Sequence, residues 1–304
     1  MTNRILDISQ EGTALRVRND QLVVQRNGET DEKTVPLEDI AILVVSHAQT
    51  TYTHSVLTGL TQKGGSLIVC DEKHLPSGMC LPLGGHSLQA ERAILQMEAS
   101  APVKKQLWKQ IVCAKIREQS ALLQHFRQRD YGLERLRKEV RSGDPDNVEA
   151  RAAKIYWRHI FNLPFHRNRF GEPPNNMLNY GYAILRAIIA RGICGAGLYP
   201  ALGLHHHNRY NSFCLADDLM EPFRAIVDRA VVETLHSMEA IPAELTPQIK
   251  AALIQPLLQR FRFNGEFRTL FDIASITANS MVEAFQGTRK DLLLPESIEP
   301  YSNA

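Results

Sequence analysis

The spacing of apolar residues changes along this chain, and the change limits the folds that the chain can adopt. Over roughly the first 80 residues the apolar positions form short runs of strand length rather than helical stripes. Asn19-Asp20 separates two of these runs and is a two-residue connection typical of a β-hairpin. Residues 54–62 have helical spacing instead and end before Gly64-Gly65. The predicted strands cover residues 13–18, 21–25, 40–45 and 66–70.

From about Ser87 onward the apolar residues follow a helical period. A polar break at residues 141–147 separates two of the predicted helices, and Asp146 or Asn147 is suited to cap the second of them. Pro173-Pro174 precedes a helix that is apolar almost all round, and helices continue to about residue 286. We therefore predict a two-domain α+β fold, with a small β-rich N-terminal domain (1–85) and a larger all-α domain (86–304).

Composition narrows the class of protein. The chain has 304 residues, of which 44% are hydrophobic and 22% charged, as is usual for a globular protein. Its five cysteines are scattered without a Cys-x-x-Cys pair, which indicates buried thiols in a reducing compartment. The N-terminus lacks the apolar run of a signal peptide, and no stretch approaches 18 apolar residues. These features predict a cytoplasmic protein that does not enter a membrane.

Imidazoles and carboxylates gather in one stretch of the helical half. Residues 203–209 form a loop that contains His205, His206 and His207, and residues 215–224 read as an acidic helix start. Asp218 and Glu221 are three residues apart and share a helix face. Imidazole and hard oxygen ligands with positive charge nearby are suited to hold a divalent cation against a phosphate. Acidic residues placed only to cap the helix would explain Asp217 and Asp218 well, but Glu221 less well.

A further carboxylate lies at the start of the helix predicted after the polar break. Glu149 shares its helix face with Ala152, Ala153 and Tyr156, so that this face is expected to pack inward. A buried carboxylate needs a counter-charge or a metal, because desolvating it alone costs several kcal/mol or more. The alternative is a glutamate favoured by the helix dipole, an effect of roughly 0.3–1 kcal/mol.

The charge distribution points to an anionic partner, although the net charge is only +2. Between Glu149 and Phe170 the chain has five basic residues and one acidic residue, a local charge of +4. A basic surface with no partner is the other interpretation. The chain has no Gly-x-x-x-x-Gly-Lys-Ser/Thr, Gly-x-Ser-x-Gly or His-Glu-x-x-His motif, which argues against a P-loop nucleotidase, a serine hydrolase and a zincin.

Taken together, four stretches resemble the CRISPR-associated integrase family, the Cas-one subunit of spacer acquisition, in order and spacing. The resemblance extends over essentially the whole chain and is greatest to the version found in type II systems. The four stretches are Glu149 with the Ala-Ala-Lys-Ile-Tyr-Trp of residues 152–157, Asn-Asn-Met-Leu-Asn-Tyr-Gly-Tyr (175–182), Gly-Leu-His-His (203–206) and Asp-Leu-Met-Glu-Pro-Phe-Arg (218–224).

The resemblance implies a set of site residues. Glu149, His205 and Glu221 occupy the three metal-ligand positions of the family, and the ion is expected to be Mg²⁺ or Mn²⁺. Asp218 aligns with an additional acidic position and is auxiliary. The resemblance assigns no role to Asp217, His206 or His207.

It also implies an activity and partners. The family is expected to insert short foreign DNA into a CRISPR array, by attack of a DNA 3′-hydroxyl on a phosphodiester at the edge of a repeat, as the adaptation step of antiviral defence. The assembly is expected to be a homodimer, formed through the β-rich half, joined by a small Cas-two subunit into a heterohexamer-like complex on prespacer and leader-repeat DNA. The residues expected to contact DNA phosphates are Arg151, Lys154, Arg158, Arg167, Arg169, Arg209 and Arg224.

Two other functions stay open at this point. One is a different metallohydrolase, such as a zinc amidase or phosphatase that uses His205 and His207 together. The other is a non-catalytic DNA-binding scaffold subunit whose acidic residues only cap helices.

Overall fold

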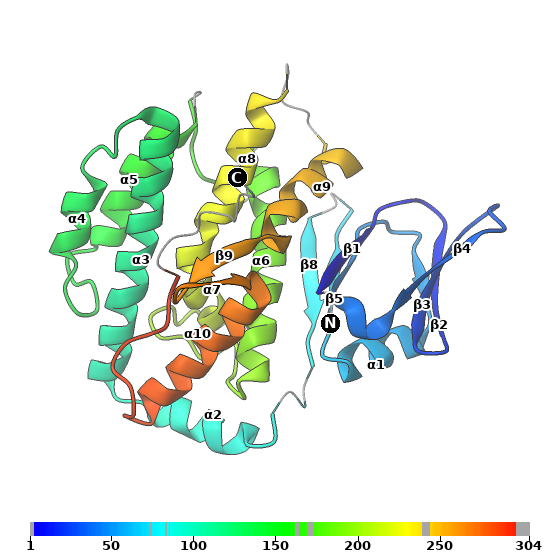
Figure 1. Cartoon of the computed structure of the whole chain (residues 1–304), viewed down its shortest axis with the longest axis horizontal. Helices are drawn as coiled ribbons and strands as arrows, with labels where there is room; N and C mark the ends of the chain where they lie inside the picture. The colour runs from blue at the N-terminus through cyan, green and yellow to red at the C-terminus, as the bar shows by residue number, and fades with distance from the viewer. Residues whose placement is uncertain are drawn as a thin grey trace.

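In the residues that the structure describes, two four-stranded sheets form the N-terminal part of the protein (Figure 1). The structure, a computed structural model, describes residues 3–72, 75–82, 84, 86–161, 164–168, 173–238 and 244–295. One sheet has the strand order β1-β5-β7-β8 and the other the order β4-β3-β2-β6. The elements are β1 (Arg4–Ile8), β2 (Thr13–Arg18), β3 (Gln21–Arg26), β4 (Glu32–Pro36), β5 (Ile40–Val45), β6 (Thr51–Tyr52), α1 (His54–Gln62), β7 (Ser66–Cys70) and β8 (Pro76–Cys80).

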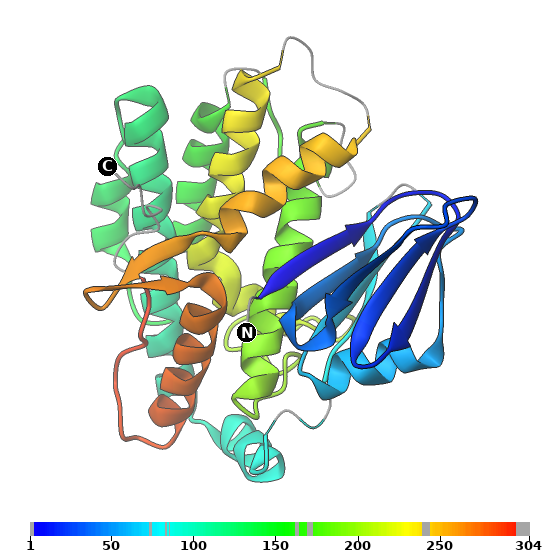
Figure 2. The same ribbon diagram turned by 45° about the vertical axis from the view of Figure 1, so that its right-hand side comes forward.

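The predicted hairpin and the predicted strands are confirmed. β2 pairs antiparallel with β3, and Asn19 and Asp20 both have positive φ (52° and 58°), as the right-handed twist of a two-residue hairpin requires. Every residue of β5 is buried, because β5 lies between β1 and β7 and both faces of its sheet are covered. One face packs with the second sheet and α1, while Ile42 and Val44 belong to the core shared with the helices. Figure 2 shows the two sheets with α1 beneath them.

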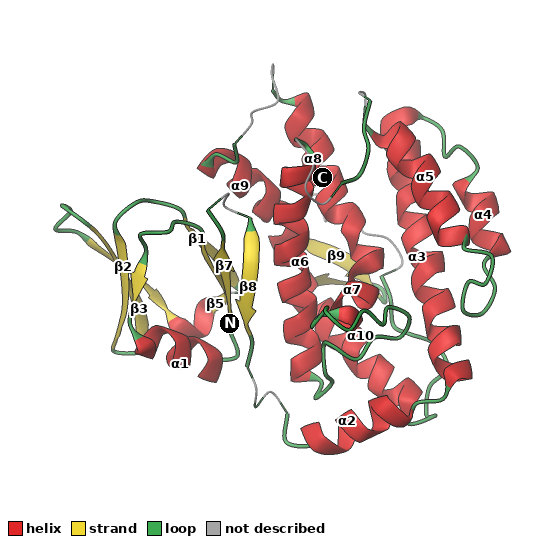
Figure 3. Ribbon diagram, turned by 180° about the vertical axis from the view of Figure 1, so that it is seen from behind, coloured by secondary structure: helices red, strands yellow, loops and turns green. Residues whose placement is uncertain are grey.

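The helices that follow enclose a central helix, α6, which is buried on almost every side (Figures 1 and 3). Its 21 residues contact α7, α8, α9 and α10 as well as the sheet strands β5, β7 and β8. The helix with almost no polar face is therefore the one that joins the sheet to the helical part. The remaining elements are α2 (Gln89–Glu98), α3 (Ala101–Arg127), α4 (Leu133–Glu139), α5 (Val148–Ile160), α6 (Asn175–Gly195), α7 (Cys214–Met220), α8 (Arg224–His236), α9 (Pro247–Ile254) and α10 (Leu270–Phe285).

The prediction of uninterrupted helices up to residue 286 is wrong for one segment. Strands β9 (Arg260–Phe263) and β10 (Glu266–Thr269) form an antiparallel hairpin between α9 and α10. Phe261 and Phe263 are buried while Arg260 and Arg262 are exposed, and Asn264-Gly265 makes the turn with positive φ at both positions. An Asn-Gly pair between alternating residues is a hairpin signal, and here it overrides the helical context. No helix in the described residues is long and apolar enough to cross a membrane.

Candidate active site

Glu149 is the second residue of α5. The start of this helix is fixed by Asp144, which precedes both of the predicted cap residues. Asp144 accepts hydrogen bonds from the backbone N–H groups of Val148 and Glu149, both at 2.9 Å. The prediction that Asp146 or Asn147 caps this helix is wrong, because Asn147 makes no capping hydrogen bond and Asp146 pairs with Arg141. Asp144 can replace them because the turn at Gly143 and Asp144 returns its carboxylate to the free amides of the helix.

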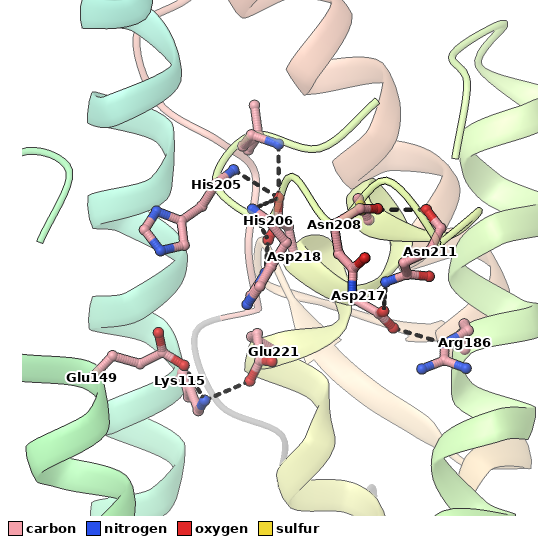
Figure 4. Close-up of polar contacts among 12 residues, drawn as sticks. Lys115, Glu149, Arg186, His205, His206, Asn208, Asn211, Asp217, Asp218 and Glu221 are labelled. Carbon is pink, nitrogen blue, oxygen red and sulfur yellow. Dashed lines mark hydrogen bonds and ion pairs between the residues drawn. The ribbon is translucent and has the colours of Figure 1, made fainter. Parts of the chain in front are cut away.

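Lys115, in the middle of α3, lies between two of the predicted site carboxylates (Figure 4). Its Nζ atom donates a hydrogen bond to Glu149 Oε1 at 2.6 Å and lies 2.7 Å from Glu221 Oε2. Burial opposes the charge on this ammonium, but the two carboxylates more than compensate and raise the pKa of Lys115 above its ordinary value. Glu149 and Glu221, which are 72 residues apart in sequence, are thus joined through one buried ammonium group. No pattern in the sequence indicated Lys115.

Glu221 lies where one helix ends and the next begins. α7 stops at Met220, a short 3₁₀ turn covers Glu221–Phe223, and α8 starts at Arg224. The turn is caused by Pro222, which cannot donate a helical hydrogen bond, so Glu221 lies beside a kink rather than within a regular helix. Burial works against ionisation of Glu221, yet Arg224 and Lys115 together hold the pKa of its carboxyl below the usual value. Glu221 is therefore a carboxylate at neutral pH.

Asp218 organises the histidine loop. Its carboxylate is fully buried and accepts hydrogen bonds from the backbone N–H groups of Leu204 (2.7 Å) and His205 (2.9 Å). His206 lies against the same carboxylate, with its backbone N–H at 3.4 Å and its ring Nδ1 in a short hydrogen bond. Gly203 makes this tight fold possible, because a Cβ atom at that position would lie 2.3 Å from the His206 carbonyl oxygen. The contacts of Asp218 are therefore those of a residue that shapes the loop.

The two neighbouring histidines have different surroundings. The His205 ring stacks on Trp108 of α3, with the planes 1° apart and the centroids 4.4 Å apart. The His206 ring instead points from Asp218 toward Glu221 and Lys115 (Figure 4). Its hydrogen bond to Asp218 raises the pKa of His206, burial lowers it, and the charges of Glu221 and Glu149 raise it further. All three histidines of the loop are exposed to solvent, and His206, which the family resemblance did not single out, is the imidazole that faces the carboxylates.

The donor chemistry of this cluster suits a hard divalent cation. Glu221 Oε2 is buried, and the Lys115 ammonium lies 2.7 Å from it as an ion pair. A carboxylate oxygen that already faces one cation is suited to bind another in its place, and Glu149 Oε1 shares the same ammonium. As they stand, no three His, Cys, Asp or Glu side chains among the described residues lie close enough together to hold a metal ion. The carboxylates are thus of the ligand type that binds such an ion, and Lys115 lies between Glu149 and Glu221.

A cavity of about 140 Å³ opens beside Glu221. In its wall, Asp228 of α8 accepts a hydrogen bond from the Tyr156 hydroxyl at 2.8 Å and a shorter one from Tyr182. Burial raises the pKa of Asp228 to about 6, although the two tyrosine hydroxyls and nearby arginines favour its ionised form. The cavity is lined by Lys115, Gln119, Trp157, Arg167, Tyr182, Glu221, Arg224, Ala225 and Asp228.

The predicted phosphate contacts fall into two groups. Arg151, Lys154, Arg158 and Arg209 are exposed, although Arg151 is paired with Glu139 of α4 at 3.2 Å. The other group points inward. Arg167 donates to Asn175 and Asn179, and Arg224 lies 3.1 Å from Glu221, so both line the cavity rather than an open surface. Arg169 lies outside the described residues.

Comparison with known proteins places this arrangement in a family. The family model described as CRISPR associated protein Cas1 matches residues 6–256. A CRISPR-associated endonuclease Cas1 from Neisseria meningitidis is 40% identical over 300 residues, which is 97% of each chain. The chain belongs to the Cas1 family. This assignment confirms the resemblance predicted from the sequence.

Solved structures show the same fold at low sequence identity. A casposase bound to its integration product superposes with a TM-score of 0.82 at 20% identity, covering 99% of this chain and 96% of that chain. A CAS1 protein from Thermotoga maritima gives a TM-score of 0.73 at 18% identity, covering 96% of this chain and 100% of that one. The arrangement of strands followed by helices is therefore the Cas1 fold.

Proposed function

We propose that this protein is a metal-dependent DNA endonuclease and integrase that inserts short DNA spacers into a CRISPR array. The observation that supports the proposal most directly is the meeting of Glu149 and Glu221 at one buried cation. The relative from Neisseria meningitidis is a CRISPR-associated endonuclease, and the casposase of similar fold is bound to an integration product; both agree with the proposal. The type II origin predicted from the family resemblance belongs to the same proposal.

Glu149 and Glu221 are proposed as the carboxylate ligands of Mg²⁺ or Mn²⁺. When bound, the ion would stabilise charge on the scissile phosphate and lower the pKa of the attacking 3′-hydroxyl. The sequence pointed to His205 as the third ligand, but the orientation of the rings favours His206 for this role. Asp218 would then fix the ring of His206, as carboxylates beside metal-binding histidines commonly do. Because the nucleophile comes from DNA, no covalent protein intermediate is needed.

The proposed assembly follows from the family and the charge distribution. One solved structure of related fold is a Cas6-RT-Cas1–Cas2 complex, and another is a Cas1–DNA complex. For this chain we propose a homodimer formed through the β-rich part (residues 1–85), joined by a Cas2 subunit on double-stranded DNA. We also propose that the boundary between the β-rich domain and the helical domain lies between residues 85 and 86.

Strand transfer tests the proposed function. A labelled short duplex is incubated with a supercoiled plasmid that carries a repeat, in the presence of the Cas2 partner and Mg²⁺ or Mn²⁺. We expect the label to join the plasmid at the repeat edge, and EDTA to abolish the joining, because both carboxylates need the ion to act on a phosphate. Failure of the folded protein to join DNA with partner and metal would favour the scaffold function. Release of a small-molecule product with tightly retained zinc would favour the metallohydrolase.

The exposed basic residues of α5 lead to a second prediction, about the salt dependence of DNA binding. Lys154 and Arg158 are four residues apart on the exposed face of α5, where they can approach the DNA backbone. The double variant Lys154→Gln/Arg158→Gln is expected to bind duplex DNA more weakly and to lower the slope of log K against log salt by about 2, since each lost phosphate contact removes about 0.9. Fluorescence anisotropy between 50 and 200 mM salt measures the slope. Arg268→Gln, at a half-buried position on β10 where the side chain pairs with Glu266, is the control and should leave it unchanged. An unchanged slope in the double variant would remove both residues from the DNA interface.

A further inference from the structure

Gln119 offers a second acceptor for the Lys115 ammonium, away from the two carboxylates. Gln119 follows one turn later on α3, so the two side chains lie on the same face of the helix. Both line the cavity beside Glu221. Gln119 is 5% exposed, and its Oε1 atom has no hydrogen-bond partner among the described residues. A buried amide oxygen without a donor is costly, so this oxygen is a favourable acceptor for an ammonium group.

The present position of Lys115 is the one that a divalent ion would need. Its Nζ atom lies within 2.7 Å of oxygens from both Glu149 and Glu221. An ammonium this close to these oxygens competes with a divalent cation for them, because the two positive charges repel each other. If Lys115 left and no ion took its place, the buried carboxylate of Glu221 and the half-buried carboxylate of Glu149 would face each other with Arg224 as the remaining cation among the described residues, and this is also unfavourable. We therefore expect one cation to replace the other.

We propose that Lys115 is an exchangeable counter-cation, which holds Glu149 and Glu221 together in the metal-free protein and turns toward Gln119 when the metal binds. This inference rests on the proposed metal site. The exchange has two consequences. Lys115 keeps the site folded and neutralised before the metal arrives, and it lowers the apparent affinity for the metal because its own contacts must first be broken. Lys115 is accordingly a positioning residue for the two carboxylates.

Metal binding without DNA tests the inference independently of activity. We would titrate the full-length protein with Mn²⁺ alone and follow free Mn²⁺ by electron paramagnetic resonance. Lys115→Met retains most of the side-chain volume and removes the charge. Its Mn²⁺ affinity is expected to rise about ten- to a hundredfold, the range for one charge-assisted hydrogen bond that no longer has to be broken. In EDTA the same variant is expected to melt at a lower temperature than the wild type, and Mn²⁺ should reverse this loss.

A second variant keeps the test decisive if Lys115→Met folds poorly. Gln119→Leu removes the acceptor but leaves Lys115 on the carboxylates, so its Mn²⁺ affinity is expected to fall several-fold, opposite in sign to Lys115→Met. Lys109→Met, on the same helix and outside the cavity, is the matched control and should bind Mn²⁺ like the wild type.

The possible outcomes separate this inference from the proposed function. If Lys115→Met binds Mn²⁺ no more tightly than the wild type, or Gln119→Leu binds it equally well, the exchange is wrong while the metal site stands. Glu149→Gln should lose Mn²⁺ in both the wild-type and the Lys115→Met backgrounds. If neither the wild type nor Lys115→Met binds Mn²⁺, both the exchange and the proposed metal site are overturned.

Discussion

Replacing Glu149 by glutamine is expected to reduce strand transfer at least a thousandfold, or roughly 4 kcal/mol in activation free energy. The substitution keeps the size of the side chain and its place at the start of α5, where Asp144 still binds the backbone amides. It removes one of the two anionic oxygens that meet at Lys115, so a divalent ion would lose a charged ligand. The measurement is the rate of joining of labelled duplex to a repeat plasmid at saturating Mg²⁺ or Mn²⁺.

Glu233→Gln is the matched control for this loss. Glu233 lies on α8 and is also paired with a cation, Arg229 at 2.7 Å, but at the surface and away from the cavity. An exposed pair of this kind contributes about 0.3–0.5 kcal/mol, so the variant should join DNA at the wild-type rate. Joining by Glu149→Gln within tenfold of the wild type, with unchanged DNA affinity, would exclude Glu149 as a metal ligand.

Local patterns were enough to predict much of the fold. The hairpin of β2 and β3 depends on the two residues Asn19-Asp20, and α6 on a continuous helical period after Pro173-Pro174. Both signals are contained within a few turns of chain. The parallel pairing of β1 with β5 is not, because Arg4 pairs with Ile40 across 36 residues and no local spacing specifies that register. The β9–β10 hairpin had its Asn264-Gly265 signal, which the surrounding helical pattern obscured.

The candidate site shows the same division between local and long-range information. Glu149 and Glu221 stand out in sequence, because each is an acid on a helix face that packs inward or beside a proline. Lys115 does not stand out, because α3 also contains Lys104, Lys105 and Lys109, and only the packing of α3 against α5 and the 3₁₀ turn selects one of them. The choice between the two adjacent histidines likewise depends on Trp108, which lies almost 100 residues earlier and stacks with His205.

Asp218→Ala is expected to lower the free energy of unfolding by about 3–5 kcal/mol and strand transfer by at least about a hundredfold. The side chain is fully buried, and its removal leaves the backbone N–H groups of Leu204 and His205 without their acceptor. The ring of His206 would lose its hydrogen bond at the same time, so the histidine loop should become mobile. Urea unfolding gives the free energy, and amide hydrogen exchange at residues 204–206 reports the loop.

Asp217→Ala separates a general loss of acidic charge from the specific role of Asp218. Asp217 is the adjacent residue, and its carboxylate binds Arg186 and Asn211 rather than the histidine loop. We expect this variant to lose about 1–3 kcal/mol of stability and to keep slow exchange at residues 204–206. Asp218→Asn retains one acceptor oxygen and should give an intermediate result. If Asp218→Ala abolishes joining while residues 204–206 remain protected, Asp218 acts on the metal or the DNA directly. If amide protection and joining are both lost, Asp218 is the residue that holds the histidine loop in place.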